Sequence, residues 1–423
     1  VAASGNNTLT LPNDGTIISK DAAGAVGVTS VVTDTIKVGA AVTISESGIE
    51  ASGIGITCAN INGAQIGGRR NIVINGAMNV AQRGTSSTTS GYGSVDRFEV
   101  QYSGTDEAPT HAQVDVASGT TPYTLGFRKS LKITNGNQTS GAGAADFIRI
   151  NQIFEAQNIA NSGWNYTSSS SFITLSFWVK SSIAQNFYGY FYTYDGSNYQ
   201  YPFETGSLTA NTWTKITKTV PGNSNITIDN NNAQGVVFVI APFFGTNYTA
   251  SGVTLDAWKA WNSSERFPDQ TSTWYTTNDA TLEVTGVQLE VGPQATPFEH
   301  RSFGEELSLC QRYYFRWTAG ATNRYACMLQ AYASNAAFGI IKQFPVVMRA
   351  APTCSVSGTY KPFGSDGSTS GHTAFSSTVI NKATKYEMVS NGWGGATGIE
   401  EGGRPVIVEA AEAEAYMDAS AEL

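Results

Sequence analysis

A run of tyrosines in the middle of the chain is the sequence feature best suited to bind a ligand. The segment FYGYFYTYDGSNYQY begins at Phe187 and alternates two kinds of aromatic residue. Side chains of a β-strand point to opposite faces in turn, so Phe187 and Phe191 would share one face and four tyrosines the other. These tyrosines are Tyr188, Tyr190, Tyr192 and Tyr194. Because a tyrosine offers a flat apolar ring and a hydroxyl, their face could stack on a sugar and bind its hydroxyls.

The same pattern also fits a purely structural role. Tyrosine can fill the space between a sheet and a loop or neighbouring subunit that covers it, with its hydroxyl bonded to water or to one partner. The polar neighbours Asp195, Asn198 and Gln200 suit either role. Aromatic residues in a later, loop-like stretch allow the same two interpretations, with packing favoured: Trp258, Trp261, Trp274 and Tyr275.

A glycine-rich stretch near the end of the chain is a second candidate site. The sequence NGWGGATGIEEGGRP, residues 391–405, predicts a long loop between two strands, and such loops often hold ligand-binding groups. Its candidate glycan-binding residues are Trp393, Glu400, Glu401 and Arg404. The indole ring would stack on a sugar while the carboxylates and the guanidinium bind its hydroxyls. The alternative is that Trp393 anchors a glycine-rich turn to the core.

Residue types typical of catalytic centres and metal sites are sparse. The four cysteines form no CxxC pair, and the three histidines stand far apart without an HExxH motif. We therefore expect no cofactor, no metal site and no enzyme activity. A glycan hydrolase needs only two suitably spaced carboxylates among the 33 acidic residues, so hydrolysis stays an alternative. We expect mostly buried free thiols, with a Cys327–Cys354 disulfide as the minor alternative, at Cys58, Cys310, Cys327 and Cys354.

Composition argues against several classes of partner. With 25 Lys and Arg against 33 Asp and Glu, the net charge is −8, so we expect no nucleic-acid binding. No apolar run reaches the roughly 18 residues of a membrane-spanning helix, so we expect no membrane insertion. Charged residues make up only 14%, and the 44 glycines stand among many Ser, Thr and Asn. These features predict an all-β protein with short strands and many turns.

Residues 1–70 form a segment of distinct composition, with many glycines and almost no aromatic side chains. Small apolar residues such as Val42, Ile44 and Ile56 recur in short steps, which predicts brief strands too thin to bury a core alone. Wrapping around identical copies would stabilise such a shaft or attachment segment, so we expect an intertwined homotrimer. A disordered linker is the alternative. Because the chain begins at Val1 without a methionine, we expect its true start to lie upstream.

Three further segments follow this shaft. Residues 71–301 alternate polar and aromatic or aliphatic residues, as in LSFWVK and GVVFVIA, which predicts a jelly-roll β-sandwich. The sequence FGEELSLCQRYYFRW predicts a short helix, and we place a helical linker at 302–314. Residues 315–423 predict a C-terminal β-sandwich knob, in which the alternation from Ala413 onward favours a final strand over a helix.

Several blocks of sequence also carry a resemblance to a known family. RRNIVINGAMNVAQRGT, SVDRF, LSFWVK and VQLEVGPQATPFEHR, in this order between residues 69 and 301, resemble the jelly-roll domain of phage tail fibres. That domain is related to carbohydrate-binding modules of glycosidases. ELSLCQRYY, FPVVMRAAPT and AYMDASAEL, between residues 306 and 423, resemble the C-termini of tail fibres from marine and other phages, which end in a compact β knob.

The resemblance implies a protein of the virion, displayed as a tail fibre. We expect a receptor-binding fibre that recognises host surface polysaccharide and mediates adsorption without catalysis. Its N-terminal end would attach to other virion proteins of the tail or head, and its C-terminal knob would meet the cell first. The alternatives are a purely structural head or tail fibre and a glycan-hydrolysing tailspike.

Overall fold

The computed structural model describes residues 70–363, 372–380, 382–397, 399 and 403–423, together with short strands before residue 70. The chain divides into two compact units, Val1–Ala59 and Asn60–Leu423. The fold is all-β, as predicted, with 41% of residues in strands and 6% in helices. In the part of the chain that the structure describes, no helix is long and apolar enough to cross a membrane.

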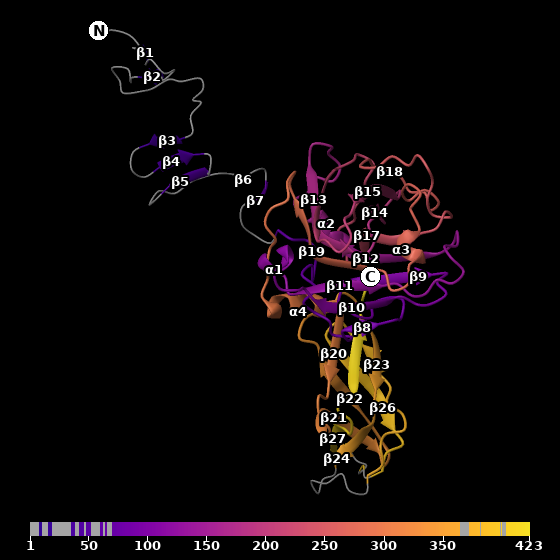
Figure 1. Cartoon of the computed structure of the whole chain (residues 1–423). Helices are drawn as coiled ribbons and strands as arrows, with labels where there is room; N and C mark the ends of the chain where they lie inside the picture. Colours follow the sequence, from indigo (N-terminus) through magenta and orange to yellow (C-terminus); the bar gives the residue numbers. More distant parts are fainter. Residues whose placement is uncertain are drawn as a thin grey trace. The chain divides into compact units, whose positions relative to one another are not determined.

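The strands before residue 70 are two to four residues long and pair only with their neighbours in sequence. They form two hairpins, β1–β2 and β6–β7, and one three-stranded sheet, β3-β4-β5 (Figure 1). The short strands expected from the glycine-rich composition are therefore present. Their bounds are β1 Thr8–Thr10, β2 Thr16–Ile18, β3 Thr35–Val38, β4 Val42–Ser45, β5 Gly48–Ala51, β6 Asn60–Ile61 and β7 Ala64–Gln65.

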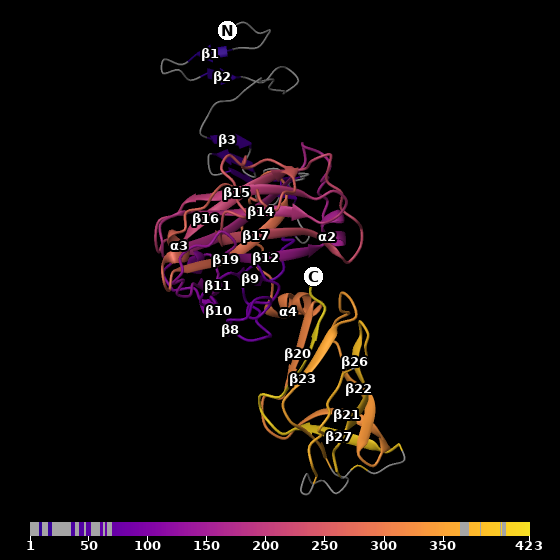
Figure 2. The same ribbon diagram turned by 90° about the vertical axis from the view of Figure 1, so that its right-hand side faces the viewer.

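The predicted β-sandwich is confirmed between β8 and β19 (Figures 1 and 2). One six-stranded antiparallel sheet has the order β16-β13-β19-β11-β10-β8, and the other has the order β18-β15-β14-β17-β12-β9. The strands are β8 Ser86–Ser87, β9 Glu99–Ser103, β10 Thr110–Asp115, β11 Lys129–Thr134, β12 Phe147–Glu155, β13 Phe172–Ser181, β14 Asn186–Thr193, β15 Tyr199–Ser207, β16 Thr214–Pro221, β17 Gln234–Phe244, β18 Lys259–Ala260 and β19 Thr281–Val291. Short helices connect them: α1 Thr121–Thr124, α2 Ala156–Ala160 and α3 Thr273–Thr276.

The sandwich core is built from the inward side chains of both sheets. Phe177 on β13 and Phe238 on β17 come from opposite sheets, and their ring centroids lie 5.9 Å apart. Both are almost fully buried, at 0% and 1% exposure. Alternate residues of the same strands therefore point outward, which is how the sandwich presents a functional surface.

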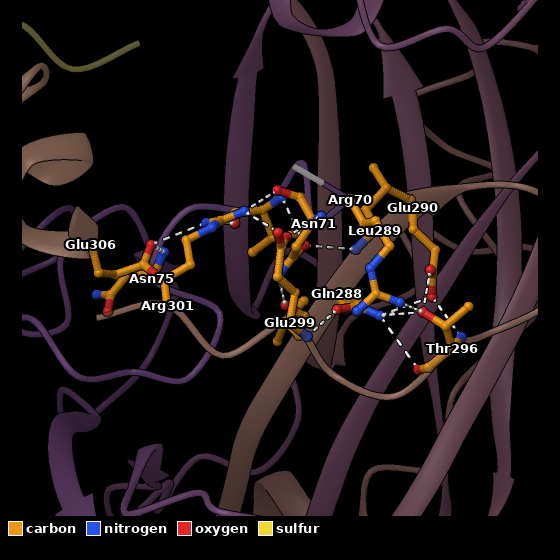
Figure 3. A network of polar contacts seen from close by, with 12 residues as sticks. Arg70, Asn71, Asn75, Gln288, Leu289, Glu290, Thr296, Glu299, Arg301 and Glu306 are labelled. Atoms are coloured by element: carbon orange, nitrogen blue, oxygen red, sulfur yellow. Dashed lines mark hydrogen bonds and ion pairs between the residues drawn. The ribbon is translucent and has the colours of Figure 1, made fainter. Parts of the chain in front are cut away.

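The residues that carry the family resemblance form a polar clamp that holds the two ends of the sandwich together (Figure 3). Arg301 donates hydrogen bonds to the backbone carbonyls of Asn71 and Val73. The same guanidinium pairs with Glu299 at 3.3 Å and with Glu306 at 3.4 Å. With only 3% of the Arg301 side chain exposed, its charge depends on these partners.

Asn71 completes the clamp on β19. Its amide oxygen accepts hydrogen bonds from the backbone N–H groups of Val73 and Leu289, and its amide nitrogen donates to the carbonyl of Val287. Its own backbone N–H donates to Glu299. These two sequence blocks, more than 200 residues apart, are thus structural in this chain and hold the sandwich closed.

The predicted helix is present as α4, Phe303–Gln311. The Ser302 hydroxyl caps it by accepting a hydrogen bond from the N–H of Glu305 at 3.3 Å. Glu305 and Glu306 stand in the first turn, where negative charge favours the helix dipole. The helix leads directly into the C-terminal strands.

Two further antiparallel sheets follow α4, with the orders β20-β28-β23 and β24-β27-β21-β22-β26-β25. In the described part of the chain, no strand of these sheets joins the sheets of the preceding sandwich. The final segment is a strand, as predicted. The bounds are β20 Tyr314–Thr318, β21 Arg324–Ala333, β22 Ala336–Gln343, β23 Thr353–Ser357, β24 Tyr360–Phe363, β25 Lys382–Ala383, β26 Glu387–Gly394, β27 Pro405–Ala410 and β28 Tyr416–Ser420.

Candidate functional site

The tyrosine ladder, Tyr188, Tyr190, Tyr192 and Tyr194, lies on and just beyond β14. As the alternation predicts, Phe187 and Phe191 are fully buried in the sandwich core. The tyrosines belong to the opposite, outward face of the β18-β15-β14-β17-β12-β9 sheet, with the outward residues of β17. The placement of the ladder on one face of a strand is therefore confirmed.

A segment between β17 and α3 covers one end of the ladder. Phe267 stacks on Tyr188, with ring centroids 5.1 Å apart and an interplanar angle of 8°. Trp261 packs against Tyr190 at 5.9 Å and against Tyr192 at 4.3 Å. Tyr190 is left only 1% exposed. For this end, the geometry favours the structural alternative, tyrosine as filling beneath a loop.

The other end of the ladder is open. Tyr194 is 37% exposed, and its ring meets that of Tyr192 edge-on at 4.7 Å. The Asn198 side chain donates a hydrogen bond to the Tyr192 hydroxyl. Tyr192 is half-buried, as Tyr188 is, so Tyr194 is the most exposed ring of the ladder.

A row of polar side chains lies on the neighbouring strands of the same sheet. It consists of Glu99 and Gln101 from β9 and of Arg149 and Asn151 from β12, and we call it the polar row. The register of β9 and β12 pairs Gln101 with Arg149 and Glu99 with Asn151. The Arg149 Nε donates to Gln101 at 2.8 Å, and the Asn151 amide donates to Glu99 at 3.0 Å. One carboxylate, one guanidinium and two amides are thus held in fixed positions.

The polar row and the tyrosine ladder belong to one site. Across the sheet, Val239 on β17 pairs with Asn151 on one side and with Tyr190 on the other. The Arg149 Nη1 donates to the Tyr190 hydroxyl at 3.4 Å. Burial raises the pKa of Tyr194 to about 12, with the nearby Arg149 charge acting to lower it. The Tyr194 hydroxyl is therefore neutral at physiological pH and can donate a hydrogen bond.

The amide of Asn151 has an unused acceptor. The residue is only 2% exposed, yet its Oδ1 has no hydrogen-bond partner among the described protein atoms. An unsatisfied buried acceptor costs about 1–3 kcal/mol, and because protein atoms cover this oxygen the cost falls on the stability of the sheet.

The sequence analysis did not single out the polar row. In the sequence, only the alternation within EVQYS and within FIRINQ indicates it. This alternation places Glu99 and Gln101 on one face of the first strand, and Arg149 and Asn151 on one face of the second. About 50 residues separate the two strands, and only their pairing brings the four side chains together.

The second candidate site is placed differently from the expectation. Trp393 lies in strand β26, not in a loop, and is 0% exposed. Its ring packs against Tyr360 and Phe375, with centroids 5.2 and 5.5 Å away. A fully buried ring cannot stack on a sugar. The geometry therefore favours the alternative that Trp393 anchors this segment to the core. Arg404 is exposed and its carbonyl accepts from the N–H of Ala331, whereas Glu400 and Glu401 lie outside the described residues.

In the described part of the chain, the His, Cys, Asp and Glu side chains form neither a metal site nor a reactive thiol centre. There, no group of three or more His, Cys, Asp or Glu side chains could hold a metal ion. Cys310, Cys327 and Cys354 are free thiols, so the alternative of a Cys327–Cys354 disulfide is wrong. Burial raises the pKa of Cys327 to about 12, and of Cys354 likewise, which makes both poor nucleophiles.

No model of a protein family and no curated protein matches this sequence. Among solved structures, the enzymatically active domain of a tailspike of bacteriophage CBA120 is 11% identical over 52% of this chain and 21% of its own, with a TM-score of 0.29. A putative sugar-binding protein of Bacteroides thetaiotaomicron is 13% identical over 52% of this chain and 99% of its own, with a TM-score of 0.26.

The N-terminal cellulose-binding domain of a β-1,4-glucanase from Cellulomonas fimi is also similar in part. It is 10% identical over 51% of this chain and 99% of its own, with a TM-score of 0.24. At these values, none of the likenesses tells what this chain binds.

Proposed function

We propose that this protein binds glycan on the outward face of its β18-β15-β14-β17-β12-β9 sheet and does not cleave it. The observation that carries the proposal is that the polar row of Glu99, Gln101, Arg149 and Asn151 lies beside the exposed Tyr194 and the half-buried Tyr192. A sugar-binding site generally combines aromatic rings with polar side chains. Their C–H faces stack on aromatic rings, and their hydroxyls exchange hydrogen bonds with amides and charged groups.

Binding without cleavage agrees with the number of carboxyl groups in the site. Glycoside hydrolysis generally needs two carboxyl groups, about 5 to 9.5 Å apart, on either side of the scissile bond. The polar row contains one carboxylate, that of Glu99, and it already accepts hydrogen bonds from Gln101 and Asn151. A hydrolase remains the outcome to test against.

The setting that we propose for this site is a homotrimeric tail fibre of a phage virion, which adsorbs to host surface polysaccharide. The sequence blocks that resemble tail fibres support this setting, and so does the thin N-terminal segment, which suits wrapping around other copies. The N-terminal end would attach to other virion proteins. With Trp393 buried, we place receptor contact on the sandwich rather than on the C-terminal loop.

Affinity electrophoresis of the full chain in gels containing host surface polysaccharide tests the proposal. The protein should be retarded, and Tyr194→Ala should weaken binding by about three- to tenfold, the loss of one stacking contact. Arg149→Ala should weaken it as well. Tyr386→Ala is a matched control, because Tyr386 is 63% exposed and lies in the C-terminal segment.

Three results would contradict the proposal in different ways. No retardation by any host polysaccharide would favour a purely structural fibre. Retardation that Tyr194→Ala and Arg149→Ala leave unchanged would place the site elsewhere. Release of oligosaccharides during incubation would identify a hydrolase.

A further inference from the structure

The β24-β27-β21-β22-β26-β25 sheet carries apolar side chains on both of its faces. Its inner face, with Leu329, Ile341 and Val408, is buried in the C-terminal core. Its outer face holds large apolar side chains that are 38% to 62% exposed. We call this set the outer apolar face: Tyr325, Met328, Tyr332, Phe338, Ile340 and Ile407.

The strand register brings these side chains together on one surface. Phe363 on β24 pairs with Ile407 on β27, and Ile407 pairs with Met328 on β21. On the other side, Ile340 on β22 pairs with Val389 on β26. Apolar side chains therefore line β24, β27 and β21 on one side and β22 and β26 on the other, with Gln330 opposite Phe338 where β21 pairs with β22.

Aromatic rings extend this apolar surface on both sides. Tyr325 meets Phe363 edge-on, with centroids 5.3 Å apart, and Tyr332 lies 5.7 Å from Phe338. A β-bulge between Tyr325 and Cys327 shifts the alternation of β21, so that Tyr325 and Met328 are both exposed.

The sequence of these strands has the pattern of strands covered on both faces. YACMLQAYA and AAFGIIK are nearly unbroken apolar runs, whereas a half-solvated strand alternates apolar and polar residues. The sandwich of the same chain shows the contrast. In β16, the exposed Lys215 and Thr217 flank the buried Ile216, and the next buried residue is Val220. In β21, by contrast, Gln330 is the one polar residue among the outward side chains between Tyr325 and Tyr332.

The exposed area is what a subunit interface requires. Six large side chains, each about half exposed, leave on the order of 600 Å² of apolar surface open. The largest apolar patch of a monomeric protein is typically about 300–600 Å², and a stable interface buries about 800 Å² on each partner. This face and its half-buried neighbours Phe363 and Val389 come close to that value.

We propose that the outer apolar face packs against the same face of other copies of this chain. The mostly apolar character of this face allows a copy of this chain as the partner. Each chain carries a net charge of −8, so two copies repel one another except where they meet through uncharged surface. Lys361 and Glu409 are cross-strand neighbours beside Tyr325 and offset each other's charge, while Lys382 pairs with Val389 at the opposite edge. The inference rests on the proposed homotrimer for the number of copies, but not on glycan binding.

The five methionines provide a direct test. Met328 is 62% exposed in the single chain, whereas the others are 0% exposed: Met78, Met348, Met388 and Met417. Dilute hydrogen peroxide oxidises accessible methionine, and mass spectrometry reports each site separately. If copies cover the outer apolar face, Met328 of the full chain will oxidise as slowly as the four buried methionines.

A matched pair of variants identifies what covers the face. Ile340→Glu places a charge in the outer apolar face, at a residue that is 48% exposed. Leu125→Glu places the same charge on the sandwich, at a residue that is 51% exposed. Ile340→Glu should raise Met328 oxidation several-fold and lower the mass measured by light scattering, and Leu125→Glu should change neither. Continued protection of Met348, Met388 and Met417 shows that the variant is folded.

Two outcomes would overturn the inference. One is rapid Met328 oxidation in the unmodified protein, whatever its mass. The other is a protected Met328 that Ile340→Glu leaves protected. Gel retardation measured on the same samples keeps the two proposals apart. Loss of glycan binding with a protected Met328 refutes the proposed function alone, and glycan binding with a reactive Met328 refutes this inference alone.

Discussion

At the scale of single residues, the site depends on side chains that are already fixed before a ligand arrives. Arg149 is bonded to Gln101 and to the Tyr190 hydroxyl, and Asn151 is bonded to Glu99. Groups that are held in this way lose little rotamer freedom on binding, so more of the interaction energy is available for affinity. The row combines the guanidinium donors of Arg149 with the carboxylate acceptor of Glu99, a pairing that suits sugar hydroxyls, which both donate and accept.

We predict that Trp393→Ala destabilises the C-terminal sheets rather than removing a binding site. The side chain is fully buried between Tyr360 and Phe375, and deleting a buried Trp typically costs about 3–5 kcal/mol. Urea unfolding should show the loss, while glycan retardation of the folded fraction stays unchanged. Tyr386→Ala, an exposed aromatic, serves as the control. Unchanged stability of Trp393→Ala would contradict the burial.

We predict a pH dependence of stability that comes from Asp96. Burial raises the pKa of this carboxyl to about 6, against hydrogen bonds from Gln82 that lower it. The folded state therefore holds the proton more tightly than the unfolded state, and the unfolding free energy should fall as the pH rises from about 4 to 6. A shift of about two units corresponds to about 3 kcal/mol as an upper bound.

Unfolding of Asp96→Asn across this pH range checks the prediction. The variant cannot ionise at residue 96, so its stability should fall less between pH 4 and pH 6 than that of the unmodified chain. Asp115→Asn, at a side chain that is 82% exposed, should leave the slope unchanged. Identical slopes for all three proteins would show that Asp96 does not titrate in this range.

At the scale of elements, the sequence allowed the strands to be predicted but not their partners. Alternation alone places Phe187 in the core and Tyr194 on the opposite side, because the period of two is a local property. Which tyrosines are covered depends on Trp261 and Phe267, about 70 residues away, and no local pattern reports that. The glycine-rich surroundings of Trp393 predict a loop, yet pairing with Ala337 continues β26 through it.

We predict that Arg301→Lys loosens the clamp that joins the two ends of the sandwich. Lysine keeps the charge but cannot reach the carbonyls of Asn71 and Val73 and the carboxylates of Glu299 and Glu306 at the same time. Removing part of such a buried network should cost about 2–4 kcal/mol in urea unfolding. Arg128→Lys is the control, since Arg128 is an exposed residue bonded to the Tyr123 carbonyl. Equal stability of the two variants would contradict the structural role of the clamp.

At the scale of the whole molecule, two features of the chain complement each other. The open end of the ladder offers Tyr192 and Tyr194 as stacking surface, so a single site gains only about 0.5–1.5 kcal/mol per ring and binds weakly. The outer apolar face, which includes Met328 and Ile340, brings several such sites together if copies pack there. Linked sites bind a repetitive polymer far more strongly than each site alone, because the second contact forms within the same complex.

We therefore predict that separating the copies weakens binding to a polysaccharide surface but not to a short oligosaccharide. Surface retention of Ile340→Glu should fall by about 100-fold, the size of a typical multivalent gain. Its affinity for an oligosaccharide that fills one site, measured by calorimetry, should equal that of the unmodified protein, because residue 340 is not part of the ladder or the polar row. Leu125→Glu should behave like the unmodified protein in both measurements. Equal surface retention of a dissociated Ile340→Glu and the unmodified chain would mean that one site alone accounts for attachment.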